Sequence, residues 1–149
     1  MGDAEWLLRI RGLICLPLLM SLLTETTPTI EVVRLDDQPW MTADDHAVAR
    51  QIVSPSNSRA QKLSIADIIV PPGVEIRKHR HAVIEEIYHV VAGKGNMWIN
   101  GATREVGAGD TIVILPNEVH AISNVSAEEL RLIVTCVPPW TPDCLIFDP

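Results

Sequence analysis

Short apolar segments rich in β-branched residues, separated by turn residues, run through the second half of the chain. Clusters of glycine, proline and asparagine recur about every 8–12 residues, and no convincing helical period appears between them. This spacing favours an all-β sandwich or barrel. The expected strands lie at residues 63–70, 86–92, 96–99, 103–106, 111–115, 119–125 and 130–137.

Local sequence adds detail at two places. The dipeptide Asn100-Gly101 separates two of the expected strands and favours a tight hairpin turn. Residues 30–35 alternate loosely and predict an edge strand, whereas residues 41–52 show no clear period.

The N-terminal region differs from the rest, because residues 12–23 form an apolar run interrupted by Pro17. The run is too short to span a membrane. It fits the apolar core of a signal segment, although the small-residue cleavage pattern is missing. It also fits an upstream extension, with translation starting at Met20, or a helix that packs or binds a partner. We therefore predict an apolar extension or linker at residues 1–28 and a single domain at residues 29–149.

Composition narrows the range of partners. The net charge is −7, and no run of lysine or arginine provides a nucleic-acid surface. We therefore expect a small-molecule substrate rather than nucleic acid or a membrane. Cys15, Cys136 and Cys144 are an odd number of cysteines without zinc-ribbon spacing, which indicates free thiols in a reducing, cytoplasmic compartment.

Three of the five histidines belong to one candidate constellation with a carboxylate: His79, His81, Glu86 and His120. Residues at i and i+2 of an extended strand face the same side, so His79 and His81 are expected to point together. Three imidazoles and one carboxylate suit a divalent transition ion: Fe, Mn, Ni, Cu, Co or Zn. An octahedral ion would keep two positions open for water, substrate or dioxygen. The alternative is that the two strand histidines are exposed in a basic stretch.

The residues around this constellation resemble the two-part signature of the cupin family. Its first part corresponds to Gly73, His79, His81, Glu86 and Gly93, and its second to Gly109, Pro116-Asn117, His120 and Asn124. One departure is Asn117 in place of the usual glycine, although asparagine tolerates the left-handed backbone region. The resemblance implies a single cupin-type jelly-roll β-barrel, with motifs at residues 73–93 and 109–124. It also implies a four-residue metal centre and a homodimer.

Four further side chains have both a functional and a structural interpretation. Glu85 is the alternative to Glu86, but strand parity places Glu86 and Tyr88 on one face. Tyr88 is expected in the same cavity, where its hydroxyl would carry a proton or simply bond to a neighbour. Asn124 is favoured as a backbone hydrogen-bonder, and His89, of opposite parity, is expected on the outer face.

The sequence leaves the type of function open. The first account is a metal-dependent enzyme for a small organic molecule. It would be a dioxygenase or a Lewis-acid isomerase, lyase or decarboxylase. The alternative is a non-catalytic cupin that holds a metal and binds or sequesters a small molecule as an accessory protein. Metal-free sugar isomerisation ranks below both, because cupin epimerases typically lack the full ligand set.

Overall fold

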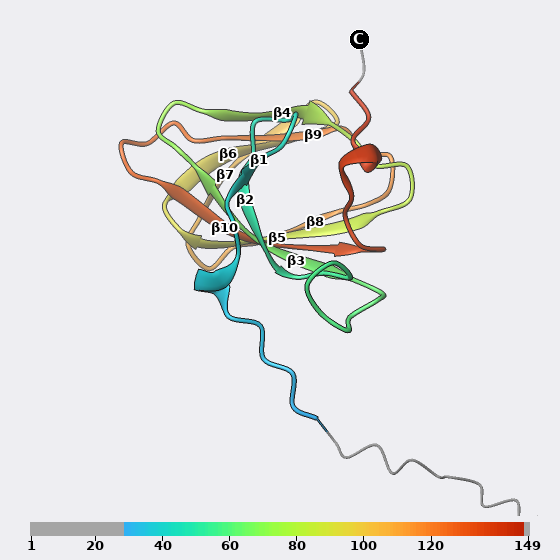
Figure 1. The fold of residues 1–149 in the computed structure, drawn as a ribbon. Helices are drawn as coiled ribbons and strands as arrows, with labels where there is room; N and C mark the ends of the chain where they lie inside the picture. The colour runs from blue at the N-terminus through green and yellow to red at the C-terminus, as the bar shows by residue number, and fades with distance from the viewer. Residues whose placement is uncertain (1–28, 148–149) are drawn as a thin grey trace, which may run out of the picture. The chain divides into compact units, whose positions relative to one another are not determined.

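The structure is a computed structural model that describes residues 29–147. Antiparallel strands form nearly all of the regular secondary structure in this range (Figure 1). In chain order the elements are η1 (Leu35–Asp37), β1 (Met41–Thr42), β2 (Val48–Val53), β3 (Ser64–Val70), β4 (Glu75–His79), β5 (Glu85–Ala92), β6 (Lys94–Ile99), β7 (Ala102–Gly107), β8 (Thr111–Ile114), β9 (His120–Ser123), β10 (Leu130–Val137) and η2 (Pro142–Cys144).

The strands form two sheets that face each other. One has the order β1-β2-β3-β10-β5-β8, and the other has the order β4-β9-β6-β7. The sheets lie one above the other in Figure 1, and their inner faces supply the core, including Ile76, Val90, Ile122 and Leu132. This is the all-β jelly-roll barrel expected from the sequence.

Every strand expected from residue 63 onward is present, with boundaries shifted by only a few residues. The hairpin between β6 and β7 turns at Asn100 and Gly101, which have φ angles of 48° and 95°. Both values lie in the left-handed region that this turn requires. Asn117 also has a positive φ, 68°, so the departure from the family pattern keeps the turn.

The expectations for the N-terminal half of the barrel were less accurate. The edge strand expected at residues 30–35 does not form; the backbone there is irregular, and Leu35 begins a 3-10 turn. Instead β1 and β2 extend the large sheet, with β2 paired to β3. All six residues of β2 are half-buried, so neither face is distinct enough to give an alternating pattern. The apolar run at residues 12–23 lies outside the described residues.

The strand that carries the first histidine is shorter than expected. β4 ends at His79, and Arg80 pairs with Ile146 of the C-terminal segment in an isolated bridge. His81 therefore follows the strand instead of belonging to it. Among the described residues, no helix is long and apolar enough to cross a membrane.

Gly93, between β5 and β6, gives a test of this packing. Its φ is +80°, and a Cβ there would collide with the Glu129 carbonyl oxygen and approach the Leu130 Cα to 2.9 Å. Gly73 has a similar φ of +74° but no atom within 4 Å of such a Cβ. We expect Gly73→Ala to cost about 1–2 kcal/mol of unfolding free energy, from backbone strain alone. Gly93→Ala should cost at least about 2 kcal/mol more, because of the added overlap.

Urea denaturation of the two variants and the wild type measures this difference. Equal losses at the two positions would contradict the close approach of residues 129–130 to Gly93.

Candidate metal centre

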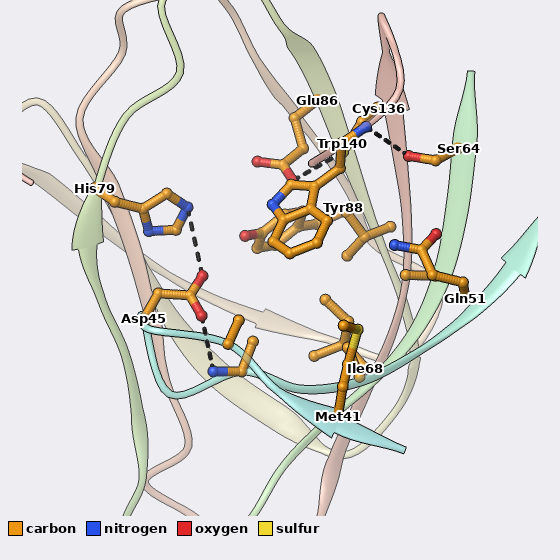
Figure 2. Close-up of a pocket in the computed structure, with 15 residues that line it drawn as sticks. Met41, Asp45, Gln51, Ser64, Ile68, His79, Glu86, Tyr88, Cys136 and Trp140 are labelled. Carbon is orange, nitrogen blue, oxygen red and sulfur yellow. Dashed lines mark hydrogen bonds and ion pairs between the residues drawn. The ribbon is translucent and has the colours of Figure 1, made fainter. Parts of the chain in front are cut away.

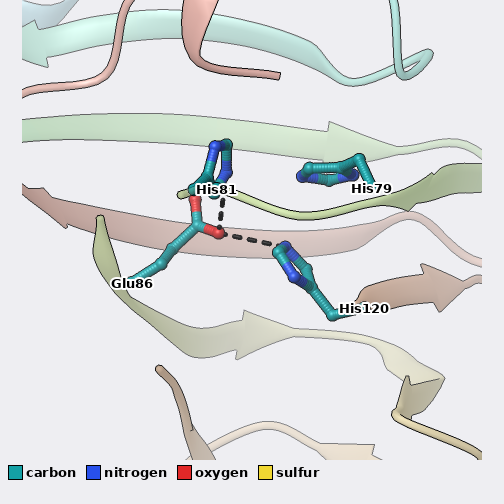
Figure 3. A group of neighbouring side chains, drawn as sticks. All are labelled: His79, His81, Glu86 and His120. Carbon is teal, nitrogen blue, oxygen red and sulfur yellow. Dashed lines mark ion pairs between the residues drawn. The ribbon is translucent and has the colours of Figure 1, made fainter. Parts of the chain in front are cut away.

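His79, His81, Glu86 and His120 meet at one end of the barrel, between the two sheets (Figure 3). His79 ends β4 and is paired in register with His120 at the start of β9, so the small sheet places these two imidazoles side by side. Glu86 comes from β5 of the large sheet, where its neighbour Glu85 is exposed. Strand parity thus selects Glu86, as the sequence predicted.

The ligand atoms of this cluster converge. One donor atom from each residue lies within 4.8 Å of all the others. Glu86 Oε2 is 3.1 Å from His120 Nε2 and 3.5 Å from His81 Nε2. Donors about 2.1 Å from a shared ion are spaced about 3–4 Å apart, so these separations suit a metal centre.

Each imidazole is oriented by a backbone carbonyl that accepts a hydrogen bond from its Nδ1–H. The acceptors are Arg77 for His79 (2.7 Å), Cys144 for His81 (3.0 Å) and Glu118 for His120 (3.0 Å). These bonds fix the tautomer and aim Nε2 away from the backbone, as for histidines that bind metals.

The buried centre contains polar atoms that the protein does not satisfy. His81 Nε2, Glu86 Oε2 and His120 Nε2 have no hydrogen-bond partner among the described residues. All four side chains are at most 4% exposed, and burial of polar atoms without partners costs free energy. A cation at their meeting point would satisfy them together, so the arrangement fits a divalent transition metal.

The charges of the cluster support the same conclusion. Burial alone would raise the pKa of Glu86, but His120 and His81 outweigh burial and hold that pKa well below its usual range. Burial likewise lowers the pKa of His81, yet the Cys144 carbonyl and Glu86 outweigh it and raise the pKa to about 10. The cluster therefore attracts positive charge, which a metal would supply in place of protons.

Cys136 holds the second oxygen of Glu86. It is buried on β10 directly opposite Glu86. Its thiol also donates a hydrogen bond of 3.2 Å to Glu86 Oε1. The bond leaves Oε2 directed at the histidines, and no sequence pattern indicated it.

A pocket adjoins the cluster, with His79, Glu86 and Tyr88 in its wall (Figure 2). The cavity has a volume of about 40 Å³, which is enough for about three waters or one small group. Tyr88 is 2% exposed, as expected for a cavity residue. Burial raises the pKa of Tyr88 well above its ordinary value, and Glu86 and Asp45 raise it further. The hydroxyl therefore keeps its proton.

The C-terminal segment closes this end of the barrel. The backbone N–H of Trp140 donates to Ser64 Oγ (2.9 Å), and the Trp140 ring forms part of the pocket wall (Figure 2). Farther along, Cys144 supplies the carbonyl that orients His81, and Phe147 contacts the His79 ring. A single tryptophan after a proline pair shows no period that would place it from the sequence.

Asp45 is a further polar residue of the pocket that the sequence did not single out. It lies in the turn between β1 and β2, is 5% exposed, and places Oδ2 3.8 Å from His79 Nε2. The missed strands explain the omission, since without them the turn at Asp45 cannot be placed.

Two other candidates turn out to lie away from the cluster. Asn124 is buried, and its amide donates to the carbonyls of Val70 (2.9 Å) and Glu128 (2.6 Å), as the backbone role predicts. His89 is exposed, and its Nδ1 lies 2.9 Å from Thr111 Oγ1.

Comparison with known proteins places this geometry in a family. Residues 66–136 match the model of the cupin domain. The chain belongs to the cupin superfamily. It is 34% identical over 104 residues to an uncharacterized protein of Methanocaldococcus jannaschii, covering 70% of this chain and 82% of the relative.

Two other cupin matches carry functional names. The pectin degradation protein KdgF of Dickeya dadantii is 27% identical over 110 residues, covering 74% of this chain and 94% of the relative. The crystal structure of a predicted oxalate decarboxylase from Thermotoga maritima superposes with a TM-score of 0.64 at 22% identity. That match covers 72% of this chain and 99% of the other, and it supports the fold alone.

Proposed function

We propose that this cupin is a metal-dependent enzyme that acts on a small organic molecule by Lewis-acid and proton-transfer chemistry, as an isomerase, lyase or decarboxylase does. One observation carries the proposal: a buried four-donor cluster adjoins a pocket whose wall includes the buried side chain of Tyr88. A protein that only stored a metal would not need a pocket with a proton donor beside the ion.

We assign His79, His81, Glu86 and His120 as the metal ligands. A divalent ion held by them would polarise a carbonyl or carboxylate oxygen of the substrate. The carbonyls of Arg77, Glu118 and Cys144 keep the imidazoles in position, and the Cys136 thiol keeps Glu86 Oε2 turned toward them.

We assign Tyr88 as the residue that transfers the proton. Its raised pKa keeps the phenol protonated, so the hydroxyl donates a hydrogen bond or a proton to a substrate oxygen. A dioxygenase would be the alternative use of the same ligands, but no buried group of the pocket specifically favours oxygen chemistry. Consumption of dioxygen during turnover would identify that alternative.

We propose a homodimer formed through the outer face of the large sheet. Exposed apolar side chains gather on this face, including Val91 on β5, Val113 on β8 and Val137 on β10. Residues with the same outward parity, such as Ile87 and Ile133, are only half-buried. A second copy would cover this apolar surface.

We also propose a cytoplasmic location. Cys136 and Cys144 are both free thiols, and free thiols are typical of a reducing compartment.

The metal assignment predicts a difference between two histidine variants. His120→Ala should abolish stoichiometric metal, because it removes a buried donor, whereas His89→Ala, at an exposed position, should retain it. Elemental analysis of purified, folded protein gives the metal-to-protein ratio. The assignment is wrong if both variants keep the metal or if the wild type takes up none when Mn, Fe, Ni and Zn are offered.

The role of Tyr88 predicts the effect of removing one oxygen atom. Tyr88→Phe keeps the ring and should lower kcat about 100-fold or more with unchanged metal content, because it removes the proton donor. Mass spectrometry in heavy water detects proton transfer to the substrate. The substrates to be tested are small hydroxy and keto acids, together with pectin fragments because the name of the Dickeya dadantii relative refers to pectin degradation. Unchanged turnover in Tyr88→Phe would contradict the role.

The dimer proposal predicts that a charge on the outer face separates the subunits. Val113 is 53% exposed, so Val113→Glu should shift the protein from dimer to monomer without unfolding it. Val125, 66% exposed in the loop before β10, offers a matched control that should remain dimeric as Val125→Glu. Sedimentation velocity at micromolar concentration distinguishes the species, and a monomeric wild type would refute the proposal.

A further inference from the structure

The pocket beside the cluster is too small for the substrates proposed above. Its volume of about 40 Å³ holds about three waters, whereas even a small hydroxy acid is larger than that. The four side chains of the cluster are at most 4% exposed, so they are not reached from the surface either. A substrate therefore comes to the cluster only if part of the pocket wall moves.

One part of that wall lies outside the sheets. Among the described residues, those that line the pocket belong to paired strands or to the turn between β1 and β2, except for Trp140. Trp140 follows β10, and its backbone N–H donates a hydrogen bond of 2.9 Å to Ser64 Oγ. Figure 2 shows its ring reaching into the same space as Glu86 and Tyr88. Movement of this ring would enlarge the pocket without breaking either sheet.

The C-terminal strap, residues 140–147, is held by contacts that can break while the barrel stays folded. None of its residues is fully buried. Two backbone hydrogen bonds of 3.0 Å join Arg80 and Ile146, and the Arg77 guanidinium lies 4.0 Å from the centre of the Phe147 ring. Segments with few buried apolar contacts open locally at a lower free energy than global unfolding. The strap is therefore the part of the wall that opens most easily.

We propose that the C-terminal strap is a lid that opens to admit the substrate and completes the metal centre when it closes. The link is the Cys144 carbonyl, which accepts the Nδ1–H of His81 at 3.0 Å. The acceptors for His79 and His120 lie two residues before each ring, so they stay in place when the strap opens. Opening frees the His81 ring alone, and closure aims its Nε2 at the cluster again. Since this inference concerns access to the same cavity, it rests on the proposed function.

Alkylation of Cys136 measures the opening, because this thiol lines the pocket and is 3% exposed. Cys15→Ser and Cys144→Ser leave it as the single thiol of the full chain, and serine at position 144 keeps the backbone carbonyl. Iodoacetamide is larger than the closed cavity, so mass spectrometry of the metal-free protein records opening. Global unfolding has the full urea dependence, whereas local opening has a small one. We expect labelling at low urea with a small urea dependence.

Two variants in this background identify the part of the wall that opens. Phe147→Ala and Trp40→Ala each remove an aromatic ring that an arginine covers, since Arg50 lies 4.5 Å from the centre of the Trp40 ring. Trp40 directly precedes β1, on the opposite wall of the pocket from the strap. Phe147→Ala should speed Cys136 labelling about tenfold at low urea, and Trp40→Ala should leave it unchanged. Thermal unfolding confirms that both variants are folded.

Three labelling results would overturn the lid. They are labelling with the full urea dependence of unfolding, an unchanged rate in Phe147→Ala, and a faster rate in Trp40→Ala alone, which would assign the opening to the hairpin of β1 and β2.

Release of Zn²⁺ to a chelator tests the link to His81. Loaded Phe147→Ala should release the ion about tenfold faster than the loaded parent protein, and Trp40→Ala should not. Equal release from all three overturns the claim that closure completes the metal centre. Protein that takes up no metal refutes the proposed function, whereas Cys136 labelling still decides whether the strap opens.

Discussion

The backbone carbonyls of Arg77, Glu118 and Cys144 fix the chemistry of this protein, because each accepts the Nδ1–H of one candidate ligand histidine. A free imidazole rotates and presents either nitrogen. With Nδ1 occupied, His81 and His120 present Nε2 toward Glu86 Oε2. His79 adds a further donor within 4.8 Å of theirs, in a place almost without solvent. Burial of these atoms without partners is unfavourable, and a bound cation removes the cost. The candidate metal centre and the pocket beside it both depend on this constraint.

The barrel supplies these carbonyls from widely separated parts of the chain. Arg77 lies two residues before His79 in β4, and Glu118 lies two residues before His120 in the loop that leads into β9. The backbone next to each of these two histidines therefore orients its ring. The third acceptor, Cys144, comes from the C-terminal segment, which is anchored by the bond from Trp140 to Ser64. This segment therefore has two roles, since it orients His81 and also closes the pocket. The turn that carries Asp45 completes the wall from the N-terminal side.

The sequence predicted the strands and the members of the buried cluster where local chemistry determines them. Glu86 was preferred to Glu85 by strand parity, and His120 by its place in the family signature, and both join the cluster. β2 was missed because its half-buried residues do not alternate, and Asp45 was missed with it. Trp140 and the Cys136–Glu86 bond depend on contacts between segments far apart in the chain, which a periodic pattern does not record. The sequence therefore indicated the metal cluster but only part of the wall that determines what binds beside it.

X-ray absorption spectroscopy on the metal-loaded protein tests the central claim most directly, because it reports which atoms surround the ion. The account predicts a first coordination shell of nitrogen and oxygen only, with the multiple-scattering signature of three imidazoles. A sulfur neighbour would contradict it by assigning the ion to Cys136 or Cys144 instead of the cluster. A shell of water-like oxygens without imidazole scattering would contradict it as well.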